Sequence, residues 1–579
     1  MVTAGLAPTS MQPLFDGIRL AVLRNGAETP WDLSPERDGL RVLSLPPGGA
    51  LEIRLAVPLG DAVGFWHPEG HWERTIVADW AGRFTSSLVG GAVAGCLFDS
   101  VGRTMLAFAS VNQAAETHAV FGVSEENKDY VVHLHVVAGQ EPYRLLFAES
   151  APSVAVAMRR LRARLAVEVP PAPTPEAAHR VVYSTWYAFN QDVEAGPVEA
   201  EAALAAEIGC GVLLLDDGWQ ELGSGRGYAG IGDWRPDLRK FPDFAAHVAR
   251  VRSLGLKYVA WVAPLLLGPD AECFAELAPY ARKAAGAPGA FALDPRLPEV
   301  RAHIVRTCAR LVAHYGLDGL KFDFLNEAMV YAGDVSDERV DVLDVGEAMR
   351  LLMAELRAAL ERIHPDVLIE LRQPYTGPGM ASFGNMLRAD DCPADATDNR
   401  VRTIDVSLMA TGGAVHSDML MWDLAATPAT AARQLLAVLH TVPQLSTRLT
   451  MLPESHLRML RFWLDQHRRL YPILRDGELE PGRPDELYAT VSATLDEDAV
   501  ISMYGERVAR VASHRRIFVV NASAVGRVVL DVTGAERTTE LTVHCATGEV
   551  VEQRLLTLRP GLFSLPVPPS GLAVLQECA

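Results

Sequence analysis

The sequence predicts an α/β protein in which a (β/α)8 TIM barrel is flanked by an N-terminal antiparallel β-sandwich domain and a small C-terminal antiparallel β domain. Three observations support this prediction. Short runs near both ends of the chain alternate apolar with polar residues, as half-buried antiparallel strands do. The middle of the chain alternates apolar strand-like runs with helical stretches, which is typical of parallel α/β architecture. A proline-rich stretch at 170–175 indicates a linker between the first two regions.

The 579 residues of the chain are too many for one hydrophobic core, so we expect several domains. Alternating runs at 18–23, 51–57 and 130–137 predict N-terminal strands, and 153–167 reads as an amphipathic helix. Similar short runs resume from about residue 485. The boundaries we expect are an N-terminal β-sandwich domain at 1–172, a barrel at 173–480 and a C-terminal β-sandwich domain at 481–579.

The middle region contains eight strand candidates, which lie at 181–189, 211–219, 256–264, 317–324, 367–374, 386–391, 414–421 and 444–449. Helical stretches between or after them lie at 197–208, 241–254, 296–314, 341–363, 400–411, 427–441 and 454–474. Eight strands with crossover helices favour a closed barrel over an open doubly wound sheet. The first strand is not followed by a glycine-rich phosphate loop, which argues against dinucleotide binding.

The charge and cysteine content exclude several classes of partner. The formal net charge of −19 argues against nucleic acids and anionic membranes, because both require a basic face. Seven scattered cysteines without CxxC spacing indicate reduced thiols. The N-terminus lacks a basic segment followed by an apolar core, and no uncharged apolar run reaches membrane-spanning length. We therefore expect a cytoplasmic protein.

An aromatic and histidine-rich cluster occupies 65–68 and 71–72 in the N-terminal region. It has two interpretations, a core at the edge of the sandwich or a loop that reaches over a neighbouring site. The sequence does not decide between them.

The carboxyl ends of the barrel strands, where the chemistry of such barrels lies, are rich in carboxylates, tryptophans and a few cations. Carboxylates accept hydrogen bonds from sugar hydroxyls, and indole faces pack on the apolar side of a sugar ring. A metal site would need His or Cys ligands at set spacing, and only His416 lies near, so we expect neither metal nor cofactor. A polyhydroxylated ligand, an oligosaccharide or glycoside, is expected to bind at Trp186, Asp216, Asp217, Trp219, Trp261, Lys321, Arg372, Arg388, Asp391 and Asp418.

Two carboxylates at these strand ends suit glycoside hydrolysis, which needs one ionised and one protonated carboxyl group. Asp323 lies two residues from Lys321 on the same face of a buried strand and suits the ionised group. Asp390 has Asp391 beside it and suits the proton donor, because a second carboxylate raises one pKa. Other interpretations are a structural Lys–Asp pair at the barrel mouth and an acidic cluster at the N-terminus of the next helix.

Several segments, jointly specific, resemble glycoside hydrolase clan D, in particular family 36 (α-galactosidase or melibiase), with echoes of family 27. The resemblance covers about 180–475. It rests on the residues at 213–220 (Leu-Leu-Leu-Asp-Asp-Gly-Trp-Gln), 232–234, 240–242, 255–261, 293–300, 321–323 (Lys-Phe-Asp), 388–391 (Arg-Ala-Asp-Asp) and 417–420.

The resemblance implies a retaining double-displacement mechanism on terminal α-galactosidic or closely related bonds. Asp323 would be the nucleophile and Asp390 the acid/base. Asp216 and Asp217 would hold ring hydroxyls, Trp186 and Trp261 would shape the pocket, and Lys321 would hold a hydroxyl and tune Asp323.

Two positions depart from the family pattern. The third strand reads Trp-Val-Ala263-Pro where a carboxylate is common, and the fifth reads Glu370-Leu-Arg372-Gln-Pro where a small thiol is common. An arginine there alters recognition near the sugar 2-position or fills part of the subsite, and it suits an anionic substituent. The alternatives are therefore a hydrolase for a different or anionic sugar, a transglycosylase of the raffinose- or stachyose-synthase kind, and a non-catalytic sugar-binding protein.

Overall fold

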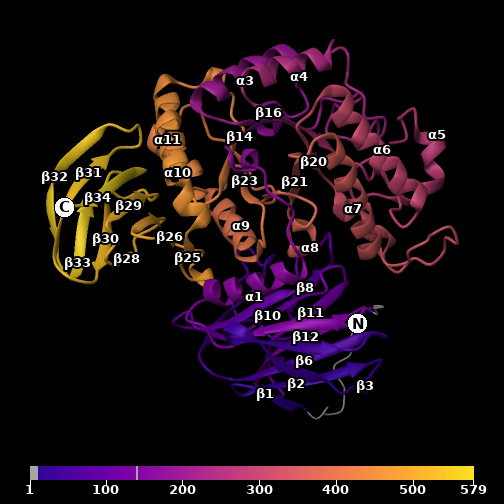
Figure 1. Ribbon diagram of the computed structural model, residues 1–579, viewed down its shortest axis with the longest axis horizontal. Coiled ribbons are helices and arrows are strands. Elements are labelled where there is room, and N and C mark those ends of the chain that lie inside the picture. The colour runs from indigo at the N-terminus through magenta and orange to yellow at the C-terminus, as the bar shows by residue number, and fades with distance from the viewer. Residues whose placement is uncertain (1–10, 138–140, 579) are drawn as a thin grey trace.

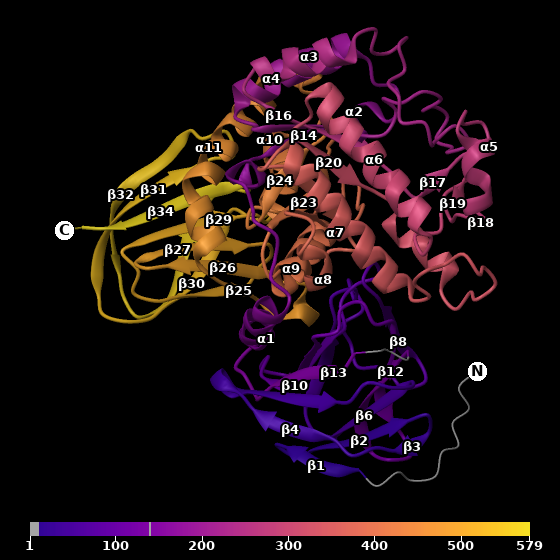
Figure 2. The same cartoon turned by 45° about the vertical axis from the view of Figure 1, so that its right-hand side comes forward.

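The computed structural model describes residues 11–137 and 141–578. Most of the N-terminal segment that we considered for a targeting signal lies outside these residues. Figure 1 shows three parts: an N-terminal β domain, a central barrel and a C-terminal β domain. In the view of Figure 2 the N-terminal domain again lies beneath the barrel, and the C-terminal domain lies beside it.

The N-terminal domain is the predicted antiparallel sandwich, built of two sheets whose apolar faces enclose a common core. The first sheet contains β1 (Gln12–Phe15), β2 (Ile18–Arg24), β3 (Ala27–Glu28), β6 (Leu51–Pro58), β8 (Gly82–Ser86), β11 (Thr117–Ser124) and β12 (Asp129–Val136). The second contains β4 (Asp32–Pro35), β5 (Leu40–Leu45), β7 (Ala62–Trp66), β9 (Ala94–Asp99), β10 (Thr104–Ser110) and β13 (Tyr143–Ala148). Helix α1 (Val154–Glu168) then packs on β10, β13 and barrel helix α9.

The eight strands of the middle region close into a parallel barrel, as predicted. Neighbouring strands follow chain order, and the last pairs with the first. The strands are β14 (Val182–Ser184), β15 (Val212–Leu215), β16 (Lys257–Val262), β20 (Gly319–Phe322), β21 (Leu368–Arg372), β22 (Met386–Arg388), β23 (Ala414–Leu420) and β24 (Val442–Leu445).

Each strand is shorter than its apolar run suggested. The residues that follow the last paired residue of each strand form the loops at the carboxyl end of the barrel. After β14 the chain turns into α2 (Trp186–Phe189), where the sequence predicted continued strand. The eighth strand starts at Val442, two residues earlier than expected. A small sheet of β17 (Leu266–Leu267), β18 (Lys283–Ala284) and β19 (Phe291–Ala292), which the sequence did not predict, lies between β16 and β20.

The longer helices of the barrel region lie near the predicted positions, whereas the four-residue helices α5 (Phe274–Leu277) and α8 (Pro378–Ala381) were not predicted. Helix α6 illustrates why: Pro298 opens it, and Gly316 ends it in a left-handed conformation with φ 66° that favours glycine. The helices are α3 (Ala195–Ile208), α4 (Phe244–Ser253), α5 (Phe274–Leu277), α6 (Pro298–Tyr315), α7 (Val345–Ile363), α8 (Pro378–Ala381), α9 (Ala396–Met409), α10 (Pro428–Ala437) and α11 (Glu454–Asp476). No described helix is both long and apolar enough to cross a membrane.

The C-terminal domain contains two sheets that are mostly antiparallel, with parallel pairing at β27–β29 and β28–β30. Its first strands pack on α11. The larger sheet holds β25 (Glu478–Pro481), β26 (Thr490–Leu495), β27 (Asp498–Met503), β29 (Arg516–Asn521), β31 (Arg537–His544), β32 (Val550–Leu558) and β34 (Gly571–Glu577). The smaller holds β28 (Val508–Val511), β30 (Arg527–Val532) and β33 (Gly561–Pro566).

Candidate active site

Asp323 follows β20 directly and turns into the barrel mouth. Its Oδ2 accepts a hydrogen bond from Trp261 Nε1 at 3.0 Å. Its Oδ1 accepts from Arg372 Nε at 2.7 Å, from the Phe324 amide at 2.7 Å and from the Tyr375 hydroxyl at 3.2 Å. Phe324 has a positive φ of 56°, which is uncommon for a residue with a side chain. The backbone bends here so that its own N–H reaches the carboxylate.

The electrostatic surroundings of Asp323 favour its ionised form. Burial alone would raise the pKa of Asp323, but the cations Arg372 and Lys321 and the Trp261 indole together hold it well below its usual range. Because the group stays charged in a largely dry site, it is a competent nucleophile or electrostatic partner at any neutral pH.

Asp390 lies beyond β22, and its side chain is 37% exposed. Arg372 Nη1 donates to Asp390 Oδ1 at 3.0 Å, while Arg372 Nε donates to Asp323. One guanidinium therefore contacts both carboxylates that the sequence nominated as catalytic. The Asp390 amide donates to Gln373 Oε1 at 3.1 Å, which fixes the backbone at this position.

The structure separates Asp390 from its neighbour Asp391, contrary to the crowded pair that we expected. Asp391 accepts from Arg388 Nη2 at 2.9 Å, and Asp390 pairs with Arg372 instead. Arg372 at the end of β21 binds Asp390, and Arg388 at the end of β22 binds Asp391, so the two carboxylates point to different partners. The acidic cap of helix α9 is a third residue, Asp395, which accepts from the amides of the first turn.

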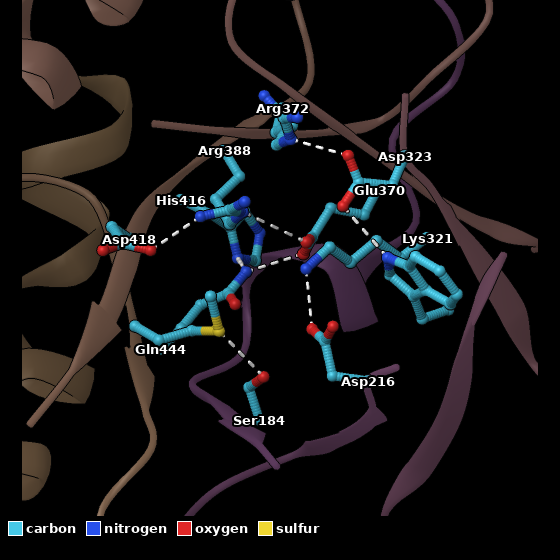
Figure 3. A network of polar contacts seen from close by, with 12 residues as sticks. Ser184, Asp216, Lys321, Asp323, Glu370, Arg372, Arg388, His416, Asp418 and Gln444 are labelled. Atoms are coloured by element: carbon cyan, nitrogen blue, oxygen red, sulfur yellow. Dashed lines mark hydrogen bonds and ion pairs between the residues drawn. The ribbon is translucent and has the colours of Figure 1, made fainter. Parts of the chain in front are cut away.

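The residues Asp216, Asp217 and Lys321 form the polar floor of the mouth. Lys321 Nζ donates to Asp216 Oδ2 at 2.6 Å, so the lysine pairs with the residue that follows β15 and not with Asp323, two residues away (Figure 3). Asp217 accepts from Gln220 Nε2 and Gln191 Nε2, each at 2.7 Å. Burial raises the pKa of Asp217 to about 6 despite these amide donors.

A second set of buried polar side chains lies beside Asp216, Asp217 and Lys321. In this set Arg388 Nη1 donates to Asp418 Oδ1 at 2.6 Å. Gln444 Nε2 donates to Glu370 Oε2 at 2.6 Å, and Figure 3 shows these side chains converging inside the barrel. Burial raises the pKa of Glu370. Asp418 is fully buried and also binds the Cys392 amide, so it supports Arg388 from behind and is not open at the mouth.

The three predicted tryptophans have different positions. Trp261 is buried, and its indole N–H holds Asp323. Trp186 on α2 is half-buried, with the Arg226 guanidinium 5.4 Å from its ring centre. Trp219 is fully buried, stacks on Phe244 of α4 and donates to the Trp261 carbonyl oxygen. It therefore buttresses Trp261 from outside the barrel, and the expectation that it contacts a sugar is wrong.

Sequence reasoning did not assign three further residues that contact the site. Tyr375 donates to Asp323, and Tyr228 stacks on Trp261 with ring centres 6.4 Å apart. Glu69 of the N-terminal domain lies 3.3 Å from Gln373 Nε2. Only Glu69 had a signal in the sequence, since it lies between the two halves of the aromatic cluster, which could reach a neighbouring site. Among residues 11–137 and 141–578, no group of three or more His, Cys, Asp and Glu side chains could hold a metal ion.

Comparisons with known proteins point to one family. Residues 169–433 match the melibiase family model. An α-galactosidase of Escherichia coli is 28% identical over 166 residues, which is 28% of this chain and 23% of that protein. α-Galactosidase AgaA of Geobacillus stearothermophilus is 27% identical over 160 residues, 26% of this chain and 22% of AgaA. The matched segments thus span about a quarter of these relatives' length.

Solved structures share the fold over most of the chain. A family 36 α-galactosidase from Geobacillus stearothermophilus, in complex with 1-deoxygalactonojirimycin, has a TM-score of 0.64 at 15% identity and covers 97% of this chain and 82% of its own. An α-galactosidase from Thermus thermophilus, in complex with p-nitrophenyl α-D-galactopyranoside, has a TM-score of 0.57 at 18% identity and covers 79% and 94%. Residues 169–433 are therefore a melibiase domain, and the chain is a relative of the α-galactosidases of glycoside hydrolase family 36.

Proposed function

We propose that the chain is a retaining glycoside hydrolase that cleaves terminal α-galactosidic or closely related α-glycosidic bonds. One observation carries the proposal: Asp323 and Asp390 both lie within hydrogen-bonding distance of a single guanidinium, that of Arg372. A retaining site needs its two carboxyl groups about 5–5.5 Å apart, and a shared guanidinium brings both to the same part of the barrel mouth, in keeping with the proposal.

In the first step, Asp323 attacks the anomeric carbon while the bond to the leaving oxygen breaks. Asp390 supplies a proton to that oxygen, so the aglycone leaves as a neutral alcohol and a glycosyl ester forms on Asp323. The hydrogen bonds from Trp261, Tyr375 and the Phe324 amide hold the attacking carboxylate in one orientation. For Asp390 to reach the glycosidic oxygen, the substrate must take the place that Arg372 Nη1 holds.

In the second step, Asp390 takes a proton from water and the water oxygen attacks the anomeric carbon. The ester bond breaks, Asp323 returns as a carboxylate, and the sugar leaves with its original anomeric configuration. Asp216, Asp217 and Lys321 line the floor, where they would bind ring hydroxyls. The charged pair Lys321–Asp216 presents both donors and acceptors there.

A sugar with an anionic substituent is a second candidate substrate, and Arg372 favours it. Among the described residues, Arg372 Nη2 has no hydrogen-bond partner, while Nε and Nη1 hold the two carboxylates. A free guanidinium edge at the sugar-binding mouth suits a carboxylate substituent.

A screen of the purified protein against nitrophenyl glycosides tests both candidates. The panel is α-galactoside, α-N-acetylgalactosaminide, α-glucoside, β-L-arabinopyranoside and α-galacturonide. Cleavage of the α-galactoside supports the proposal, and cleavage of the α-galacturonide alone supports the anionic sugar. Turnover of none of the five would contradict the proposal. Repeating the assay with an acceptor sugar measures glycosyl transfer against hydrolysis.

A further inference from the structure

A loop of the N-terminal domain reaches the barrel after β7. It is fixed to helix α9 by the buried carboxylate Asp405, which accepts from Trp66 Nε1 at 2.8 Å and from Arg74 Nη2. Tyr488, at the start of the C-terminal domain, donates to the same carboxylate at 2.7 Å. Three donors bind this fully buried carboxylate, and the two from the N-terminal domain hold the loop against α9.

The docked loop places Glu69 against the fifth strand end. Gln373 Nε2 lies 3.3 Å and 3.5 Å from the two carboxyl oxygens of Glu69. Gln373 Oε1 accepts the Asp390 amide, and the Gln373 carbonyl oxygen accepts Arg372 Nη1 at 2.7 Å. The side-chain amide of Gln373 thus lies between Glu69 and the Asp390 backbone. The backbone carbonyl oxygen of Gln373 binds Arg372, which in turn binds the Asp390 carboxylate.

Glu69 and the Asp390 N–H together favour one orientation of the Gln373 amide. The amide has one accepting oxygen and one donating NH2 group, and Glu69 offers accepting oxygens. The NH2 group therefore faces Glu69, and the oxygen faces the Asp390 N–H. Without Glu69 the amide could turn its NH2 group toward that N–H, which would break the hydrogen bond.

Charged groups on three sides define the surroundings of Glu69. Helix α9 contributes Asp405 and Arg402, and the rim of the barrel contributes Asp390. The loop that carries Glu69 contributes Arg74 and also His71, whose Nε2 lies 3.8 Å from Glu69 Oε2. Burial and the nearby Asp405 raise the pKa of Glu69 to about 8. Even in its neutral form Glu69 keeps a carbonyl oxygen that accepts from the Gln373 NH2 group.

We propose that Glu69 is a positioning residue for Asp390, acting through Gln373, so that the N-terminal β domain supplies one side chain to the acid/base machinery of the barrel. The inference rests on the proposed role of Asp390. Because a general acid matters most when the leaving group is poor, a defect in Asp390 geometry depends on the leaving group. A general loss of stability would not.

The test compares Glu69→Ala and Glu69→Gln with wild type and with Glu73→Ala, an exposed carboxylate in the same loop. Each variant is assayed on a nitrophenyl α-glycoside and on an unactivated α-linked disaccharide of the same sugar. We expect Glu69→Ala to lower kcat/KM about 10- to 100-fold on the disaccharide and less than about threefold on the nitrophenyl glycoside. Glu69→Gln keeps an acceptor for Gln373 and stays within about threefold of wild type on both, as does Glu73→Ala.

Equal activity of Glu69→Ala and wild type on both substrates would overturn the inference. So would an equal loss on both, since that is the mark of a structural role, and thermal unfolding would show it as a lower Tm. A wild-type protein without any α-glycosidase activity would overturn the proposed function itself, and this inference with it. Loss of disaccharide activity alone in Glu69→Ala, with Glu69→Gln restored, would establish the positioning role.

Discussion

The ends of β20 and β22 carry the two proposed catalytic carboxylates in contrasting surroundings. Asp323 has four hydrogen-bond donors and a side chain that is only 12% exposed, whereas Asp390 has one side-chain donor within 3.0 Å and is 37% exposed. A buried carboxylate whose oxygens accept hydrogen bonds from protein donors stays charged and keeps one orientation. An exposed one can exchange protons with water and with a leaving group.

This contrast supports the different tasks that we propose for these two residues of the same type. The nucleophile must remain ionised and aimed, and the surroundings of Asp323 provide both. The acid/base must gain and lose a proton in each turnover, and the position of Asp390 at the open side of the mouth permits that. Arg372 joins the two, so its removal should affect them unequally.

Substitution of Asp323 should have the largest effect. Asp323→Gly removes the attacking group, so we expect kcat to fall at least about 10⁴-fold. Added azide should restore part of the turnover and give a glycosyl azide of inverted anomeric configuration, which NMR identifies. Normal activity of this variant would mean that another group is the nucleophile.

Substitution of Asp390 should lower activity by an amount that depends on the leaving group. In Asp390→Ala we expect about a 10²- to 10⁴-fold loss on unactivated glycosides, because general acid catalysis contributes that much. Glycosides with nitrophenyl leaving groups should form the glycosyl-enzyme nearly normally, giving a burst, and azide should then yield the retained anomer. An equal loss with good and poor leaving groups would contradict the acid role.

Arg372→Met tests the link between the two carboxylates. The guanidinium helps to hold the pKa of Asp323 low, so its removal should raise that pKa. The acid limb of the pH profile of kcat/KM reports the group that must be ionised, and we expect it to move to higher pH. Arg350→Met, an exposed change on α7, is the control. An unmoved acid limb would show that Arg372 does not tune Asp323.

Trp261→Phe should have the smallest effect of the four. It removes one hydrogen bond to Asp323 and leaves the ring in place. A hydrogen bond to a charged group contributes about 1.5–3 kcal/mol, so kcat/KM should fall about 10- to 100-fold with little change in Tm. A loss as large as that of Asp323→Gly would mean that the indole does more than orient the carboxylate.

The strands, helices and barrel closure could be predicted because apolar periodicity directly encodes local structure. The motif around Lys321 and Asp323 predicted a carboxylate at the end of the fourth strand, and Asp323 lies directly after β20 in the barrel mouth. Pairing across the barrel could not be predicted, because it depends on the side-chain directions of strands far apart in sequence. Lys321 thus pairs with Asp216, which follows β15, and Asp390 and Asp391 pair with different arginines.

Contacts between domains were also beyond sequence reasoning. The aromatic cluster at 65–72 had two open interpretations, and the structure supports both. Phe65 lies in the sandwich core, while Trp66 and Glu69 reach the barrel. Trp219 shows the opposite error: its place at a strand end suggested sugar contact, but its ring faces α4.

Trapping of the covalent intermediate tests the division of labour between Asp323 and Asp390 most directly. The protein is incubated with a 2-deoxy-2-fluoro glycosyl fluoride of the sugar that it cleaves, digested, and mapped by mass spectrometry. We predict a single glycosylated peptide with the sugar on Asp323 in wild type and in Asp390→Ala. Labelling of Asp390, or turnover with no labelled peptide at all, would contradict the account.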